Sequence, residues 1–253
     1  VKHAYELIEN NTDLLKYDDN QLFTHQKQLF QMLQRDMVQP RLILYTAPTG
    51  TGKTLTPIGI SEKYRVIFVC VARHIGLALA KSAISVGKKI AFGFGCQTAS
   101  DIRLHYFAAK DYKKDWHSGG IFKVNNSVGD NVEIMICDVQ SYITCMHYML
   151  AFNSAGKIVT FWDEPTITLD YEEHELHSII KNNWKNNVIP TVVLSCATLP
   201  EHNELIDIEQ DFRNKFIDYE FPGEMYSVSS YDCKKSISIL DKDGYNTLPH
   251  YLF

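Results

Sequence analysis

The feature of this 253-residue sequence that most constrains its fold is a glycine-containing octapeptide at residues 47–54. An apolar run at residues 41–45, typical of a buried strand, precedes the octapeptide, and residues 55–64 can form a helix. A strand, a loop ending in Gly-Lys-Thr and a helix are together typical of a phosphate-binding loop. The alternative interpretation is a chance turn rich in glycine and threonine. The octapeptide consists of Ala47, Pro48, Thr49, Gly50, Thr51, Gly52, Lys53 and Thr54.

The residue types in this loop suit contact with a triphosphate. Gly50 and Gly52 allow backbone N–H groups to turn toward a phosphate without an intervening side chain. Lys53 is placed for the β- and γ-phosphates, and the Thr54 hydroxyl for Mg²⁺. Ala47 departs from the glycine that is usual at the first position. The loop therefore predicts that the chain binds ATP together with Mg²⁺.

Two adjacent carboxylates, Asp163 and Glu164, follow a second apolar run at residues 157–162. Carboxylates at the carboxyl end of a buried strand can complete a site that hydrolyses nucleotides. Asp163 is predicted to hold Mg²⁺, directly or through water, and Glu164 to polarise the attacking water. The alternative interpretation is an acidic turn that ends a strand.

Apolar, β-branched runs alternate with helical patterns along most of the chain. Strands that alternate with helices form a mostly parallel sheet with helices on both faces. The predicted fold class is therefore a three-layer α/β domain of the P-loop NTPase type. Further strands are predicted at residues 66–72, 90–95, 132–138 and 188–196, with short ones at 216–221 and 236–240.

Composition excludes some classes of protein. The net charge of −5 excludes a generally basic nucleic-acid coat, so contact with phosphate backbones requires a local patch. The six cysteines form no C-x-x-C pair, which indicates reduced thiols and an intracellular, reducing compartment. There is no apolar stretch of about 18 residues and no signal peptide, so we expect no membrane contact. Because the first residue is valine, we expect a fragment or a processed chain.

Two further segments each have two interpretations. Gln26 lies in a helical pattern at residues 21–37, shortly before the phosphate loop, where its amide could pair with the adenine edge. The alternative is a glutamine that faces solvent.

Residues 96–131 interrupt the alternation with basic residues placed between aromatic rings, a mixture that suits binding of single-stranded nucleic acid. The alternative is an insertion that packs its own aromatic side chains.

The order of these motifs resembles the first RecA-like domain of superfamily 2, the DExD/H-box or DEAD-like helicases and translocases. The resemblance spans roughly residues 21–200. It implies a RecA-like ATP-binding domain at residues 21–222, with an N-terminal extension at 1–20. Residues 223–253 would be a linker or the start of a second domain. The sequence around residues 162–166 is also similar to helicase-like ATPases of large DNA viruses.

The resemblance implies roles for residues outside the ATP site. In the family, one motif contacts a nucleic-acid backbone, a second belongs to the same nucleic-acid and coupling group, and a third links the ATP state to nucleic-acid binding. The first motif matches Ala72 and Arg73, and the third matches Cys196, Ala197 and Thr198. Residues 138–141, which include Gln140 and Ser141, occupy the place of the second motif, although the Thr-Pro that is usual in the family is absent there.

Three departures from the family pattern bear on function. Thr166 stands where the named subfamilies have Asp or His, and Cys196 replaces a serine. No second RecA-like domain is evident after residue 200. That domain would supply an arginine finger, which is worth about 10³- to 10⁵-fold in rate. We therefore expect this chain alone to bind ATP and Mg²⁺ but to hydrolyse ATP slowly.

Three functions agree with these expectations. The first is the N-terminal ATPase lobe of a motor on DNA or RNA, which works with a second RecA-like domain in the same chain or in trans. The second is an ATPase that packages DNA, terminates transcription or remodels a complex without unwinding. The third is a nucleotide-binding structural or interaction module that no longer turns over.

Overall fold

The computed structural model describes residues 23–34, 39–48, 50–114, 121–166, 172–200, 204–231, 239–243 and 245–248. The predicted extension at residues 1–20 and Thr49 of the phosphate loop lie outside these residues. So does the segment 115–120 of the predicted insertion.

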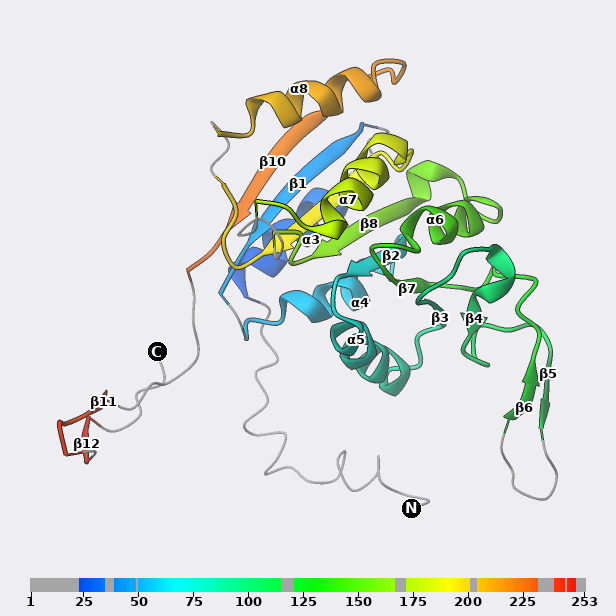
Figure 1. Ribbon diagram of the computed structural model, residues 1–253, viewed down its shortest axis with the longest axis horizontal. Coiled ribbons are helices and arrows are strands. Elements are labelled where there is room, and N and C mark those ends of the chain that lie inside the picture. Colours follow the sequence, from blue (N-terminus) through cyan, green and yellow to red (C-terminus); the bar gives the residue numbers. More distant parts are fainter. Residues whose placement is uncertain are drawn as a thin grey trace.

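An eight-stranded sheet forms the centre of the molecule, in the order β10-β1-β9-β8-β2-β7-β3-β4 (Figure 1). Neighbouring strands are parallel except β3 and β4, which are antiparallel. The prediction of a mostly parallel sheet is confirmed. The strands are β1 (Arg41–Thr46), β2 (Arg65–Cys70), β3 (Ile90–Gly93), β4 (Arg103–Leu104), β7 (Ile134–Asp138), β8 (Ile158–Asp163), β9 (Thr191–Cys196) and β10 (Glu224–Ser229).

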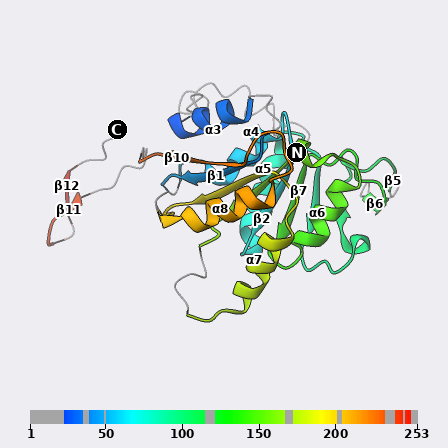
Figure 2. The same ribbon diagram turned by 90° about the horizontal axis from the view of Figure 1, so that it is seen from above.

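Helices cover both faces of this sheet, as predicted (Figure 2). Alternate residues of each strand face opposite sides, so Leu42 and Ile43 of β1 enter different apolar cores. Helices α6, α7 and α8 pack on the core that contains Leu42, and α3, α4 and α5 pack on the other. The helices are α3 (Thr24–Gln34), α4 (Thr56–Ile60), α5 (Arg73–Ser85), α6 (Tyr142–Leu150), α7 (Glu175–Asn186) and α8 (Ile206–Lys215).

The carboxyl ends of the parallel strands meet at one edge of the sheet. Thr46 at the end of β1 pairs with Cys196 at the end of β9, and Asp163 of β8 pairs with Ser195. Asp163 also pairs with Cys70 on its other side. This register places the phosphate loop and the two carboxylates at the same edge, with one strand between them.

The chain differs from the predicted elements in two places. The helix after the phosphate loop is shorter than residues 55–64, because a 3₁₀ turn at Lys53–Leu55 precedes the five-residue α4. The strand predicted at residues 216–221 is wrong, since α8 is followed there by turns in which Phe216 packs on Phe212. The next strand is β10, which pairs with β1 along its whole length. The sheet therefore continues past residue 222, the predicted end of the domain.

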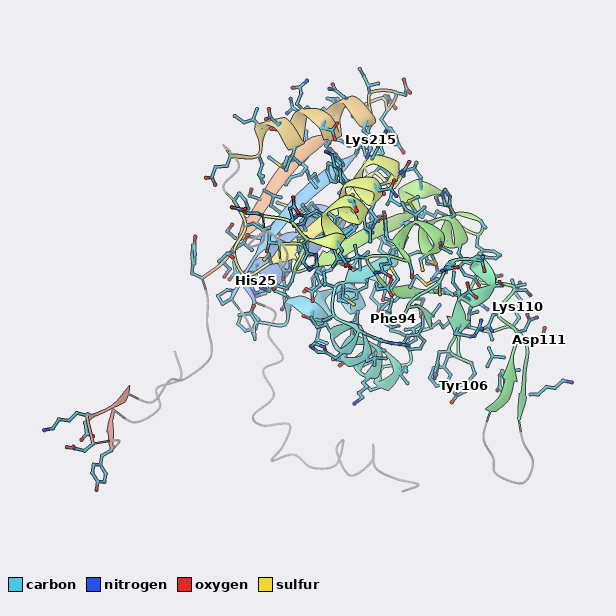
Figure 3. The ribbon with its side chains drawn as sticks, viewed as in Figure 1. His25, Phe94, Tyr106, Lys110, Asp111 and Lys215 are labelled. Carbon is cyan, nitrogen blue, oxygen red and sulfur yellow. The ribbon has the colours of Figure 1, made fainter. Side chains whose placement is uncertain are left out.

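The predicted insertion includes β4 and a separate hairpin of β5 (Tyr112–Lys114) and β6 (Ile121–Val124), which extends from the edge of the sheet (Figure 1). Its rings contact one another: Tyr106 lies 4.6 Å from Phe107 and 5.5 Å from Tyr112, centroid to centroid. Lys110, labelled with Tyr106 in Figure 3, forms a 2.7 Å ion pair with Asp130. These contacts favour the interpretation that the insertion packs its own aromatic side chains.

A second two-stranded ribbon lies near the C-terminus, formed by β11 (Ile239–Leu240) and β12 (Asn246–Leu248). Among the described helices, none is both long and apolar enough to cross a membrane.

The membership of β10 in the sheet can be tested at two adjacent positions. Val228 is 1% exposed and packs in the core, whereas Ser227 beside it is exposed. We expect Val228→Asp to lower the free energy of unfolding by about 3 kcal/mol or more, because it buries an unpaired carboxylate. Ser227→Asp should change it by about 0.5 kcal/mol or less. Equal denaturation midpoints for the two variants would place β10 outside the folded core.

Candidate nucleotide-binding site

The phosphate loop follows β1 directly and needs its glycines. Gly50 and Gly52 have φ angles of 86° and 77°, a left-handed conformation that residues with a Cβ atom adopt at a cost. The loop is held from within, since the Thr51 hydroxyl donates to the Pro48 carbonyl over 2.7 Å. From outside the loop, the Thr56 hydroxyl donates to the Gly52 carbonyl over 3.1 Å. These two hydrogen bonds hold Thr51 and Gly52, the described residues of the loop on the side of Lys53.

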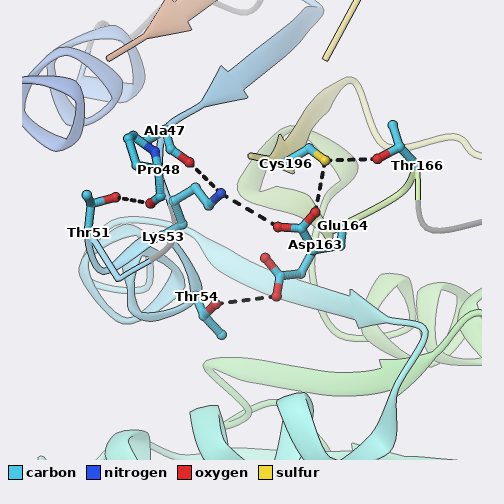
Figure 4. Close-up of polar contacts among 9 residues, drawn as sticks. All are labelled: Ala47, Pro48, Thr51, Lys53, Thr54, Asp163, Glu164, Thr166 and Cys196. Carbon is cyan, nitrogen blue, oxygen red and sulfur yellow. Dashed lines mark hydrogen bonds and ion pairs between the residues drawn. The ribbon is translucent and has the colours of Figure 1, made fainter. Parts of the chain in front are cut away.

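Lys53 connects this loop to the carboxylates on β8 (Figure 4). Its Nζ donates to the Ala47 carbonyl over 2.5 Å and lies 3.6 Å from Glu164 Oε1. The Lys53 side chain is only 6% exposed, so these two acceptors compensate a nearly buried cation. The predicted pairing of phosphate loop and carboxylates is thus present as a direct contact.

Asp163 faces Thr54, the other residue predicted to bind the metal. The Thr54 hydroxyl donates to Asp163 Oδ2 over 3.4 Å. Oδ1 of Asp163 is buried and has no hydrogen-bond partner among the described residues. An unpaired carboxylate oxygen beside a hydroxyl is a suitable donor set for Mg²⁺, which prefers oxygen ligands and retains water and phosphate oxygens. No group of three or more His, Cys, Asp or Glu side chains within the described part of the chain offers a competing metal site.

The surroundings of Asp163 disfavour its charge. Burial, with a contribution from the neighbouring Glu164, raises the pKa of Asp163 from 3.8 to about 6, although Lys53 and the hydroxyls of Thr54 and Ser195 act in the opposite direction. A carboxylate that is this poorly compensated gains from a nearby divalent cation. The site therefore fits Mg²⁺ both in its ligand atoms and in its electrostatics.

Glu164 is held in an unusual backbone conformation. Its φ of 52° makes it the only residue other than glycine with a positive φ in the described part of the chain. The Glu164 N–H donates to the Ser195 carbonyl on β9 over 2.7 Å, which continues the parallel ladder between β8 and β9, and the positive φ then turns the chain out of the strand. The side chain is about one-third exposed, so its carboxylate can reach a water at the edge of the sheet. Such strained conformations gather at functional sites.

Gln26 lies against the phosphate loop, as the sequence suggested. Its Oε1 accepts a 3.1 Å hydrogen bond from the Phe23 N–H, which fixes the amide at the start of α3. A Cβ atom added to Gly52 would lie 2.9 Å from Gln26 Nε2, so the amide nitrogen is in close contact with the loop. Contact with adenine stays a prediction.

A buried hydrogen-bonded chain behind the loop was missed in the sequence. His25 Nδ1 contacts the Tyr45 hydroxyl at 2.6 Å, and that hydroxyl lies 3.3 Å from Thr56 Oγ1. Because Thr56 in turn donates to Gly52, the chain runs from α3 through β1 to the phosphate loop. Tyr45 reads as an ordinary core aromatic in sequence, and only its neighbours in space give its hydroxyl a role.

The residues that the resemblance assigns to nucleic-acid contact differ in their exposure to solvent. Arg73 is exposed at the start of α5, capped by Ala72, and its guanidinium lies 5.0 Å from the centre of the Phe94 ring. Gln140 is exposed and lines a 780 Å³ cavity beside Gly95.

The other residues in this group range from buried to exposed. Ser141 is fully buried, and its hydroxyl accepts from the Cys96 N–H over 2.8 Å. Cys196 is also buried, at 2% exposure, whereas Ala197 is half-buried and Thr198 exposed. Direct contact of a bound polymer with Ser141 or Cys196 thus requires local movement, and the exposed residues are the better candidates.

The unfavourable burial of Asp163 can be measured. The pKa of Asp163 is raised to about 6 in the folded chain, so folding takes up a proton between about pH 4 and pH 6. The contribution of Asp163 to the free energy of unfolding therefore rises as the pH falls through that range. Asp163→Asn removes the buried charge, so we expect it to stabilise the nucleotide-free chain by about 1–3 kcal/mol at pH 7. The gain should shrink toward pH 4. Chemical denaturation at both pH values would show this; a gain independent of pH would contradict it, and the exposed Asp111→Asn is the control.

Comparison with known proteins finds solved structures of similar fold, but no related sequence. The sequence matches no protein-family model and no curated protein. In structure, the chain is similar to the DEAD-box helicase Mss116 bound to single-stranded RNA and UDP-BeF, with 13% identity, a TM-score of 0.51, and coverage of 88% of this chain and 43% of that chain. It is also similar to a hypothetical ATP-dependent RNA helicase from Sulfolobus tokodaii, with 17% identity, a TM-score of 0.49, and coverage of 88% and 56%.

The chain thus spans about half the length of these solved helicase chains. This chain therefore has the three-layer RecA-like fold that the solved DEAD-box helicase Mss116 contains.

Proposed function

We propose that this chain is the ATP-binding lobe of a nucleic-acid-dependent ATPase of the DEAD-like type. The observation that carries the proposal is the convergence of Lys53, Thr54, Asp163 and Glu164 at one edge of the sheet, with the contacts described above. A phosphate-binding lysine, a hydroxyl and two carboxylates are the groups that phosphoryl transfer to water requires. An acidic turn beside a chance loop would not bring these four side chains together.

Each of these residues has a distinct task. The loop N–H groups and Lys53 bind the phosphates, and Thr54 with Asp163 would hold Mg²⁺. When bound, Mg²⁺ supplies positive charge to the phosphate oxygens. Glu164 orients the attacking water and accepts its proton. Incoming phosphates compete with Glu164 for Lys53, so binding of the triphosphate frees the carboxylate for this task.

A nucleic acid is the proposed partner at the same edge of the sheet. Arg73, Gln140 and Thr198 are exposed just after β2, β7 and β9, so all three lie at the same edge of the sheet as the nucleotide site. One cation and several polar groups suit a phosphate backbone better than a base edge. A second RecA-like lobe, in the same protein or in trans, would close over the nucleotide and supply the missing arginine.

A nucleotide-binding interaction module is the second candidate function. The specific observation in its favour is the pair of departures at Thr166 and Cys196, which replace residues usual in the family's hydrolysing members. This module would bind ATP with the same residues, but nucleic acid would not stimulate hydrolysis.

Paired substitutions separate binding from hydrolysis. Lys53→Ala should weaken ATP affinity by about 10- to 150-fold, because it removes a charge-assisted contact with the phosphates. Glu164→Gln should leave ATP affinity within about twofold and abolish turnover. Binding is measured by calorimetry and turnover by phosphate release, with the exposed Lys157→Ala as the control. Unchanged affinity in Lys53→Ala would disprove the assignment of the phosphate loop.

Stimulation by a polymer distinguishes the two candidate functions. We expect single- or double-stranded DNA or RNA to raise ATP hydrolysis by the longest natural form of the protein. Arg73→Ala should weaken binding of that polymer at every sequence and reduce its salt dependence by about one unit of slope. Lys81→Ala, an exposed change on the same helix, is the matched control. Intact ATP binding without stimulation by any polymer would favour the interaction module.

A further inference from the structure

Two of the positions where this chain departs from the family pattern meet in space. The Thr166 hydroxyl lies 2.9 Å from Cys196 Sγ, although 30 residues separate them in sequence. Cys196 Sγ also contacts Glu164 Oε2 at 2.9 Å (Figure 4). The three side chains form an unbroken row that ends on the carboxylate predicted to activate water.

The direction of hydrogen bonding in this row follows from its chemistry. An ionised carboxylate has no proton to give, so the Cys196 thiol donates to Glu164. The thiol has a single proton, so the Thr166 hydroxyl must in turn donate to the sulfur. Burial raises the pKa of Cys196, and the bond to Glu164 raises it further, so the thiol keeps the proton that this arrangement requires.

The row distinguishes the two oxygens of Glu164. Oε2 is engaged by the thiol, while Oε1 faces Lys53 at 3.6 Å, on the side of the phosphate loop. The backbone of Glu164 is fixed separately, through its N–H bond to the Ser195 carbonyl. Because Cys196 is the next residue on β9, one strand end holds both the backbone and the carboxylate of Glu164.

We propose that Cys196 and Thr166 are positioning residues that hold Oε2 of Glu164 and thereby aim Oε1 at the attacking water. This inference rests on the proposed hydrolysis of ATP and deepens it. Thr166 and Cys196 then act as a pair of uncharged side chains. The Thr166 hydroxyl orients the Cys196 thiol, and the thiol orients the Glu164 carboxylate.

Conservative and disruptive substitutions separate positioning from simple packing. Cys196→Ala and Thr166→Val remove the donors, and we expect kcat to fall by about 100-fold and about 10-fold respectively, since a misplaced catalytic group is costly. ATP affinity should stay within about twofold. Cys196→Ser and Thr166→Ser keep a donor and should retain kcat within about fivefold. The double variant Cys196→Ala/Thr166→Val should be no slower than Cys196→Ala alone, because both residues act through one contact.

A spectroscopic readout tests the contact without relying on turnover. The S–H stretching band of Cys196 is isolated as the infrared difference between the unaltered chain and Cys196→Ser. A thiol bonded to a carboxylate absorbs at lower frequency than a free thiol, so this band should move to higher frequency in Glu164→Gln. A band that does not move would overturn the inference, whether or not the chain hydrolyses ATP. Thermal melts confirm that each variant is folded.

The outcomes separate this inference from the proposed function. If the unaltered chain binds no ATP, the proposed function fails, and the S–H band still decides whether Cys196 holds Glu164. If the unaltered chain hydrolyses ATP and Cys196→Ala retains full kcat, the positioning role is wrong and the proposed function stands. An equal loss of ATP affinity and kcat in Cys196→Ala, together with a lower melting temperature, would make Cys196 a packing residue only.

Discussion

The nucleotide site depends on contacts between the ends of two strands that are not neighbours. β1 leads into the phosphate loop and β8 leads into the two carboxylates, but β9 lies between them. Two interstrand spacings amount to about 10 Å, which the loop after β1 and its side chains span together. Lys53 and Thr54 make the contacts, and because Lys53 is nearly buried, the Ala47 carbonyl and the Glu164 carboxylate compensate its charge. The position of β9 therefore decides which side chains can serve the site, and it explains why residues at the end of β9 contact the carboxylates.

Local sequence was sufficient to predict the parallel sheet and to select the side chains that meet at its carboxyl edge. Buried parallel strands are continuous apolar runs, and the phosphate loop needs glycines at fixed spacing, so both leave a strong local signal. The edge strand β10 leaves a weaker one, because only Met225 and Val228 of its residues are buried. The alternating apolar residues at 216–221 imitate a strand but belong to a turn. The contacts of Tyr45 with His25 and of Cys196 with Thr166 join distant segments, so no spacing in the sequence could reveal them.

Features that cost folding free energy, an unpaired buried carboxylate oxygen and a left-handed backbone, occur together at the carboxyl edge of the sheet. Asp163 has a buried oxygen without a partner, and Glu164 has a left-handed backbone that costs about 1–3 kcal/mol. The two apolar cores on either face of the sheet offset these terms. Lys53, Thr54, Asp163 and Glu164 already contact other side chains at this edge, so the proposed binding of phosphate and metal would relieve electrostatic strain there.

The last strand of the sheet also gives the site a mechanical connection. β10 runs parallel to β1 and ends at the same edge, where the Ser230 N–H donates to the Thr46 carbonyl over 2.9 Å. Thr46 is the residue immediately before the phosphate loop. Tension applied to the chain beyond Ser230 would therefore act on the base of that loop through this hydrogen bond. Conversely, a change in the shape of the loop would alter the direction in which the chain leaves the sheet after β10.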